Sequence, residues 1–145
     1  MENRIILSRE EKLSLLPFIA LMADITFKIR QSGIFSVKVE IDSSNDDFFI
    51  LAFNLISGGH NPQHVKYVLD NFIHSSANNS IDYVKKYIQR DVLTMGGEHP
   101  NYFMGAVFLS YFGFDFKQEF YDGLKALLPR LIYDSFFPSE FCSTE

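Results

Sequence analysis

Hydrophobic residues recur every three to four positions over most of this chain, which is the period of an amphipathic α-helix. Ser8 and Glu11 have the spacing of a capping box, and the apolar positions after them predict a helical segment that continues to Arg30. Pro17 lies inside this segment, so we expect either a kink or a break between two helices at that point.

The same period predicts further helices, whose apolar faces lie at 48–56, 65–73, 81–95 and 116–137. Pro100 opens an aromatic-rich run before the last of these, and we expect Pro129 to bend that last helix. Short connections between six or seven helices predict an all-α fold, a compact bundle.

One segment has an ambiguous pattern. From Phe35 to Ile41, apolar residues alternate with polar ones, and this alternation taken alone is typical of a β-strand. The choice between strand and helix therefore stays open on the pattern alone.

Paired glycines followed by a proline occur twice, and each set is typical of a helix end followed by a new helix start. The residues predicted to form these structural turns are Gly58, Gly59, Pro62, Gly96, Gly97 and Pro100. Within the first turn we expect Gly59 to adopt the left-handed conformation. Neither glycine pair has the strand context or the lysine of a phosphate-binding loop.

Composition supports a single folded domain over residues 1–145. Of these residues 47% are hydrophobic and 21% are charged, which leaves enough apolar surface to offset the entropy lost on folding. The formal net charge is -5 and no basic stripe is present, so a nucleic-acid partner is not expected. The N-terminus does not resemble a signal peptide, and the single cysteine, Cys142, favours a cytoplasmic location.

The uncharged run from Pro100 to Phe114 raises the question of a membrane helix. A spanning helix needs roughly 20 apolar residues, and this run ends at Asp115. We therefore expect a buried or docking helix, with membrane association as the less favoured alternative.

The search for catalytic or metal-binding patterns gives little. His60 and His64 have the i, i+4 spacing of two metal ligands, but Asn61 and Pro62 place a helix start between them. No nucleophile elbow and no paired cysteine and histidine motif is present. We expect no metal, no cofactor and no enzymatic activity.

Several residues together follow a known family pattern. Arg30 lies shortly before Gly33, the acidic pair Asp46-Asp47 opens the next helix, and the Gly58-Gly59 turn precedes Pro62. In this order the segment from Ala23 to Leu69 resembles the cytoplasmic region of the flagellar motor stator A subunit (MotA), in the proton-channel family that includes TolQ and ExbB. The resemblance implies that the ambiguous segment is helical.

A fainter similarity continues from Met95 to Val107, which looks like the family's Gly-Gly-x-x-Pro start of its third membrane helix. Charged residues from Asp115 onward interrupt this pattern, and the two N-terminal membrane helices have no counterpart. The resemblance is therefore to a degenerate member that lacks the transmembrane channel.

The family's rotor-contacting loop uses an arginine before the glycine and a glutamate a few residues after it. Arg30 matches the arginine, whereas Lys38 takes the glutamate position and Glu40 follows two residues later. The resemblance implies that Arg30, Lys38 and Glu40 contact a protein partner, with the charge reversed at Lys38. Arg30 also fits an ordinary cation at a helix C-terminus, and both interpretations stay open.

Aromatic content predicts association. Sixteen phenylalanines and seven tyrosines exceed what a small core is expected to hide, which favours a homodimer or a complex with a helical partner. The predicted interface residues on the uncharged run are Tyr102, Phe103, Phe108, Tyr111 and Phe112. The alternative is a core helix within a monomer.

Together these observations predict a non-enzymatic protein-interaction domain that binds a flagellar motor or envelope-complex protein, in the cytoplasm or at the inner face of the cell membrane. One alternative is a peripheral or membrane-inserted accessory subunit of a proton-driven MotA/TolQ-like complex. A second is an unrelated helical enzyme or ligand-binding bundle.

Overall fold

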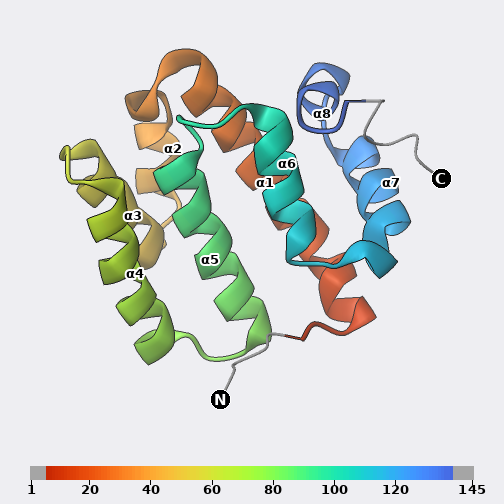
Figure 1. The fold of residues 1–145 in the computed structure, drawn as a ribbon, viewed down its shortest axis with the longest axis horizontal. Coiled ribbons are helices and arrows are strands. Elements are labelled where there is room, and N and C mark those ends of the chain that lie inside the picture. Colours follow the sequence, from red (N-terminus) through yellow and green to blue (C-terminus); the bar gives the residue numbers. More distant parts are fainter. Residues whose placement is uncertain (1–5, 139–145) are drawn as a thin grey trace.

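The computed structural model describes residues 6–138, and this part of the chain is all-α (Figure 1). Its elements are, in order, α1 (Arg9–Ser32), the 3₁₀ helix η1 (Ile34–Val37), α2 (Lys38–Ser43), α3 (Asp47–Ser57), α4 (Pro62–Ser76), α5 (Ser80–Met95), α6 (Asn101–Ser110), the 3₁₀ helix η2 (Phe114–Phe116), α7 (Lys117–Leu127) and α8 (Arg130–Phe136). The all-α prediction is confirmed. The described residues form eight α-helices rather than six or seven.

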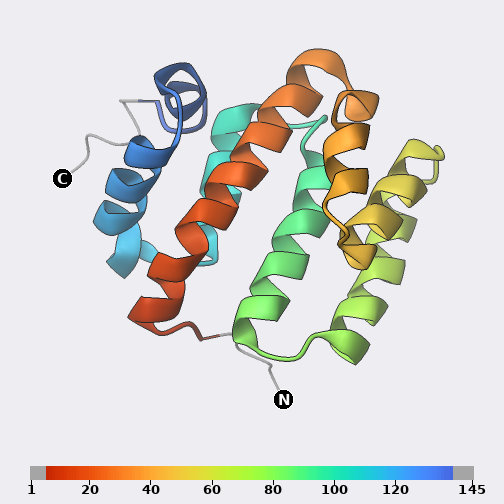
Figure 2. The ribbon, with the colours of Figure 1, turned by 180° about the vertical axis from the view of Figure 1, so that it is seen from behind.

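Helix α1 is the central element of the bundle. It lies between the α2–α5 group on one side and α6, α7 and α8 on the other (Figure 2). Its N-terminus carries the predicted capping box, in which Ser8 and Glu11 bond to each other's backbone N–H groups. Ile19 and Ala23 on its buried face are fully covered. This helix therefore joins the two halves of one core.

The two internal prolines have different outcomes. Pro17 lies within α1, which continues across it as a single helix of 24 residues, so of the two alternatives the break into two helices does not occur. Pro17 is exposed. Pro129 separates α7 from α8, where we expected one bent helix. Leu128, directly before it, has extended backbone angles, as the proline ring requires.

The ambiguous segment is helical, as the family resemblance implied. Gly33 ends α1 with φ of +90°, and η1 and α2 follow. Val37 and Ile41 are completely buried, whereas Phe35 and Val39 are 64% and 76% exposed. Residues four apart thus share a side, which is the helical period and not the strand period.

The first glycine turn has the predicted geometry. Gly59 has φ of +86°, so its left-handed conformation is confirmed. Asn61 then caps α4 by accepting a hydrogen bond from the backbone N–H of Gln63, and Pro62 occupies the first helical position.

The uncharged run is divided in the fold. Helix α6 takes only ten of its residues, and a turn at Gly113, with φ of +88°, precedes η2. Within residues 6–138, none of the helices has the length and apolar character needed to cross a membrane.

Candidate functional site: an aromatic pocket over α6

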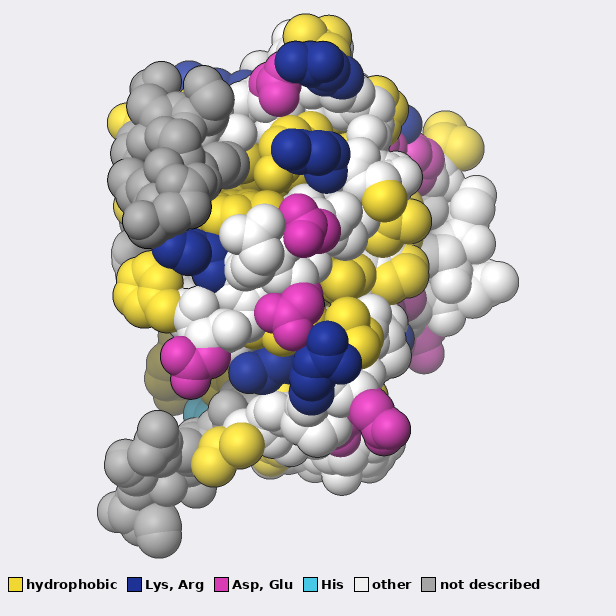
Figure 3. All heavy atoms as spheres, turned by 90° about the vertical axis from the view of Figure 1, so that its right-hand side faces the viewer, with side chains coloured by type: hydrophobic (Ala, Val, Ile, Leu, Met, Phe, Trp, Pro, Cys, Tyr) yellow, Lys and Arg dark blue, Asp and Glu magenta, His cyan; other side chains and the backbone are white. Residues whose placement is uncertain are grey.

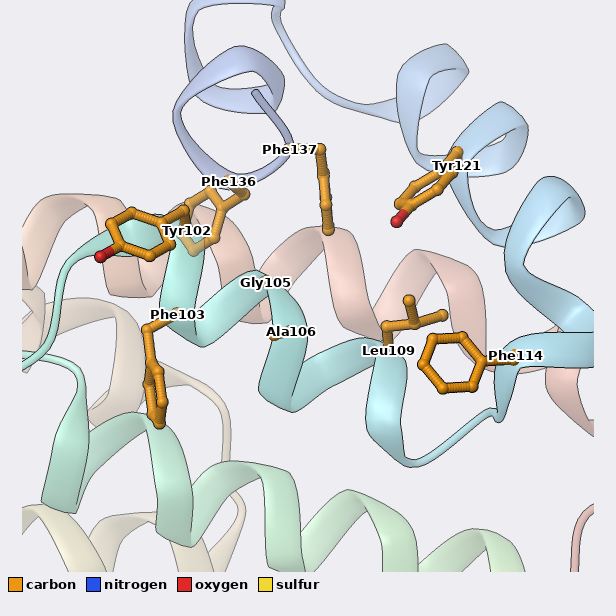
Figure 4. A pocket seen from close by; sticks show the side chains of 9 residues that line it. All are labelled: Tyr102, Phe103, Gly105, Ala106, Leu109, Phe114, Tyr121, Phe136 and Phe137. Atoms are coloured by element: carbon orange, nitrogen blue, oxygen red, sulfur yellow. The ribbon is translucent and has the colours of Figure 1, made fainter. Parts of the chain in front are cut away.

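An apolar pocket of about 330 Å³ lies over the outer face of α6. Figure 4 shows α6 at its base, α8 above it, and α7 and η2 at one end. We call it the aromatic pocket, and its lining residues are Tyr102, Phe103, Gly105, Ala106, Leu109, Phe114, Tyr121, Phe136 and Phe137.

Two glycines bring the walls of the aromatic pocket together. Gly105 allows α8 to approach α6 closely, because a Cβ atom there would lie 2.4 Å from the carbonyl oxygen of Phe136. Gly113 reverses the chain after α6 and places Phe114 at the end of the pocket. The shape of the pocket therefore depends on backbone contacts and not only on its side chains.

The lining of the aromatic pocket is uncharged. Among residues 6–138, its lining includes no Asp, Glu, Lys, Arg or His, and the polar side-chain groups that these residues contribute are the phenols of Tyr102 and Tyr121. Tyr102, Phe103 and Phe114 are 49%, 41% and 83% exposed at its rim. An uncharged concave surface with exposed aromatic rings is suited to bind an apolar group by removing that surface from water.

The face beside the pocket carries charged side chains. Figure 3 shows α7 and α8 from outside, where charged side chains of both signs lie among hydrophobic ones. Ion pairs there include Arg9 with Glu119 at 3.0 Å and Arg130 with Asp134 at 3.4 Å. Interspersed charges of both signs are typical of a surface that stays in water.

The structure separates the predicted aromatic interface residues. Tyr102 and Phe103 belong to the pocket, and Phe103 stacks on His99 with ring centroids 4.5 Å apart. Phe108 and Phe112 are core residues, with 0% and 2% exposure, and this corrects their assignment to an interface. Phe108 stacks on Phe136 of α8, and Phe112, in the turn after α6, packs on Phe116 and Phe120.

Tyr111 is directed into a polar network. Its hydroxyl donates a hydrogen bond of 2.5 Å to Asp91, and Asp91 also accepts one of 2.9 Å from Arg90. Arg90 pairs with Asp70 as well, so the network joins α4, α5 and the end of α6. Burial, reinforced by the neighbouring Asp91 carboxylate, raises the pKa of Tyr111 far above its ordinary value.

The same network raises the pKa of Arg90. Its burial alone would lower its pKa, but the adjacent Asp91 and Asp70 carboxylates outweigh that effect and raise it. The two carboxylates thus compensate the partly buried guanidinium of Arg90, and the ion pairs link α4 to α5.

The charged residues implied by the resemblance lie near the end of α1 and on α2, and all three have partners within the chain. Arg30 donates to the carbonyl oxygens of Gly97 and His99, each at 3.4 Å. Lys38 pairs with Asp42 at 2.6 Å, and Glu40 with Lys28 at 2.9 Å. We call this group the charged corner: Arg30, Lys38, Glu40, Lys28 and Asp42.

The glycine turns have structural roles in this arrangement. Gly58 and Gly59 connect α3 to α4, while Gly96 and Gly97 lie between α5 and Pro100, which caps α6. Arg30 contacts the second of these turns, so that turn fixes the end of α1 against the start of α6. His60 and His64 are both exposed, and no group of three metal-ligating side chains occurs in residues 6–138.

Sequence reasoning missed most of the pocket. Gly105, Ala106 and Leu109 lie within the uncharged run but were not distinguished from its core residues. Tyr121 lies in α7, Phe136 ends α8 and Phe137 follows it, and the only pattern in the sequence that could have indicated them is the adjacent phenylalanine pair 136–137.

Comparison with known proteins finds no matching family model, curated protein or solved structure. The functional argument for this chain therefore depends on its own geometry.

Proposed function

We propose that this chain is a non-enzymatic protein-interaction domain of the stator A cytoplasmic type, and that it binds a motor or envelope-complex protein through the aromatic pocket. The observation that carries this proposal is the exposure of Tyr102, Phe103 and Phe114 around an uncharged hollow. Isolated exposed apolar residues are ordinary on protein surfaces, whereas a concave group of them is typical of binding sites.

The chemistry of the lining defines the part of the partner that enters. Because the lining residues within 6–138 are uncharged, the aromatic pocket favours an uncharged aromatic or branched aliphatic side chain and disfavours Lys, Glu or Asp. An amphipathic helix that inserts one or two such side chains is the best match, because helix-in-groove binding uses anchors of this kind.

The charged corner makes a smaller, electrostatic contribution in this proposal. Lys38 is exposed and Glu40 is partly exposed, and each forms an ion pair within the chain. A partner carboxylate near Lys38 would have to compete with Asp42, so we expect a weak contact that salt screens. Charge reversal by Lys38→Glu or Arg30→Glu is then expected to weaken binding modestly, and more at low salt than at high salt.

A second candidate function is the binding of a small apolar ligand. It is favoured by the volume of the aromatic pocket, about 330 Å³, which lies at the lower end of the range of roughly 300–1,000 Å³ found for ligand sites. A planar or short-chain uncharged molecule would suit the same lining.

The test of the proposal places a charge in the pocket. Ala106 is an exposed residue of α6 at the base of the pocket, so Ala106→Glu keeps the helix but introduces a carboxylate. Ala126 is an exposed alanine of α7 outside the lining, and Ala126→Glu is the matched control. Both variants and the unchanged protein are used to capture proteins from native lysate, with quantitative mass spectrometry as the measurement.

The proposal predicts that a motor or envelope-complex protein is captured by the unchanged protein and by Ala126→Glu, and at least tenfold less by Ala106→Glu. Equal capture by all three variants would overturn the role of the pocket. Binding of the neutral dye Nile red at one site, lost only in Ala106→Glu, with no protein captured, would favour the small-ligand candidate. Flotation with lipid vesicles after a high-salt wash would favour the membrane-associated alternative.

A further inference from the structure

The chain leaves helix α8 at the wall of the aromatic pocket. Phe136 and Phe137 both line the pocket, and Pro138 follows them directly. In Figure 4 the ring of Phe137 lies between Phe136 and Tyr121 of α7. The backbone of Phe137 is no longer helical, with φ of -131° and ψ of 71°. Residues that follow Pro138 therefore start next to the pocket, whatever path they take.

The sequence of residues 139–145, which we call segment 139–145, contains a side chain that suits this pocket. It supplies one aromatic ring, that of Phe141. The lining residues within 6–138 are uncharged, so an acidic side chain is disfavoured there, whereas an aromatic ring gains from leaving water. The other residues of the segment are small, polar or acidic: Ser139, Glu140, Cys142, Ser143, Thr144 and Glu145.

We propose that segment 139–145 docks on the aromatic pocket and inserts the ring of Phe141, in competition with a partner for the same surface. Phe141 follows Phe137 by four residues, which span at most about 14 Å when extended. Because Phe137 itself lines the pocket, this length is enough to reach its interior. The pocket also has room for the ring, since its volume is about 330 Å³ and a cavity of about 150 Å³ holds benzene.

The covalent connection makes even a weak contact effective. A segment joined by a short linker has an effective concentration in the millimolar range at the site beside it. A ligand from solution then binds only to molecules whose pocket is open, so its apparent Kd is divided by the open fraction. With Phe141 in the pocket of two thirds of the molecules, that Kd rises about threefold. The competition with a partner rests on the proposed function, whereas the docking of Phe141 does not.

The first experiment observes the contact directly in the 145-residue chain. Nuclear Overhauser spectroscopy is expected to detect contacts between the ring protons of Phe141 and the methyl groups of Ala106 and Leu109, both of which line the pocket. The methyl group of Ala126, an exposed alanine of α7 outside the lining, is the control and should show none.

The second experiment measures how far segment 139–145 blocks the pocket, with the neutral dye Nile red as the competing ligand. Phe141→Asp is expected to lower the Kd of the dye at least threefold, because an aspartate does not enter the uncharged pocket. Ser143→Asp adds the same charge to the same segment and is the matched control, with an unchanged Kd. Phe141→Ser removes the ring without adding a charge and should give the same gain as Phe141→Asp. Circular dichroism establishes that each variant is folded.

The proposal is overturned if the ring of Phe141 shows no contact with Ala106 or Leu109, or if Phe141→Asp and Ser143→Asp bind the dye equally. A contact found only between separate chains, in a mixture of labelled and unlabelled protein, would assign the pocket to a second copy and overturn it as well. Neither measurement uses a partner. Capture by Ala106→Glu tests the proposed function separately, so either proposal can fail while the other holds.

Discussion

The sequence predicts partner binding at residues of both the charged corner and the aromatic pocket. The two regions differ in how far their side chains already interact with other residues of the chain. In the charged corner, Lys38 and Glu40 have ion-pair partners within twelve residues of the chain, and Arg30 bonds to backbone carbonyls. In the aromatic pocket, Tyr102 and Phe103 remain about half exposed with an open hollow beside them.

The difference explains why the proposed function uses the aromatic pocket and not the charged corner. An exposed ion pair is already balanced internally and contributes little when a partner arrives, because the partner's charge must displace an existing one. Removal of exposed aromatic surface from water favours association directly. The proposed function therefore rests on the aromatic pocket, and three measurements test this contrast.

The largest effect is expected for Gly105→Ala, which acts on the pocket wall. An alanine usually stabilises the middle of a helix, but here its Cβ would lie 2.4 Å from the backbone oxygen of Phe136. We expect the free energy of unfolding to fall by about 1–3 kcal/mol, measured by urea denaturation, because α6 and α8 must move apart.

Gly123→Ala in α7 is the matched control for this measurement. Its Cβ would meet the end of the flexible Leu16 side chain at 2.5 Å, and that side chain can rotate away. We expect a change within about 0.5 kcal/mol. Equal destabilisation by both substitutions would contradict a pocket wall built on close backbone contact.

An intermediate effect is expected for Tyr111→Phe. This substitution tests whether Tyr111, which the sequence placed at an interface, instead stabilises the fold through its hydrogen bond to Asp91. Loss of the hydrogen bond to buried Asp91 should cost about 1–2 kcal/mol of unfolding free energy. The folded state also raises the pKa of Tyr111, so its stabilising contribution is complete below about pH 10 and is lost as the pH rises above that value.

The pH dependence gives a second check on the same residue. Above about pH 10 the unchanged protein should lose up to about 1.4 kcal/mol per pH unit through Tyr111, and Tyr111→Phe should lose less. Tyr67→Phe, at an exposed tyrosine, is the control and should keep the alkaline slope of the unchanged protein. Identical slopes of unfolding free energy against pH for all three proteins would contradict the assignment of Tyr111 to a buried hydrogen bond with Asp91.

The smallest effects are expected in the charged corner. Arg30→Ala removes two long hydrogen bonds to carbonyl oxygens and should cost about 0.5–1 kcal/mol. Lys38→Ala removes one exposed i, i+4 ion pair and should cost about 0.3–0.5 kcal/mol, less in high salt. A larger cost at Lys38 than at Gly105 would reverse the contrast between the two regions.

Local sequence signals predicted the helical segments well. The capping box at Ser8, the Asn61-Pro62 start of α4 and the left-handed Gly59 are each decided by residues within one turn of the chain. The outcome at Pro17 was not predictable in this way. A proline inside a helical pattern fits either a break or a continuous helix, and the burial of Leu15 and Ile19 on the same helix favours continuity.

The candidate site was predicted only in part. Within α6 the sequence shows uninterrupted apolar residues, so it carries no information about which side faces the core. Phe112 is buried because it packs on Phe116 and Phe120, with ring centroids 5.7 and 5.0 Å away. Those contacts exist only after the turn at Gly113 folds α7 back onto the bundle.

Local patterns along the chain are therefore enough to predict the all-α character, the main helix starts and the glycine turns, because backbone capping and helical period depend on neighbours a few residues apart. Which aromatic residues are core and which form the pocket depends on how the helices pack. The packing places Phe103 of α6, Tyr121 of α7 and Phe137 after α8 around one pocket, and it directs Tyr111 toward Asp91. Burial is a property of the packed whole, since a ring is hidden or exposed according to the helices that fold against it.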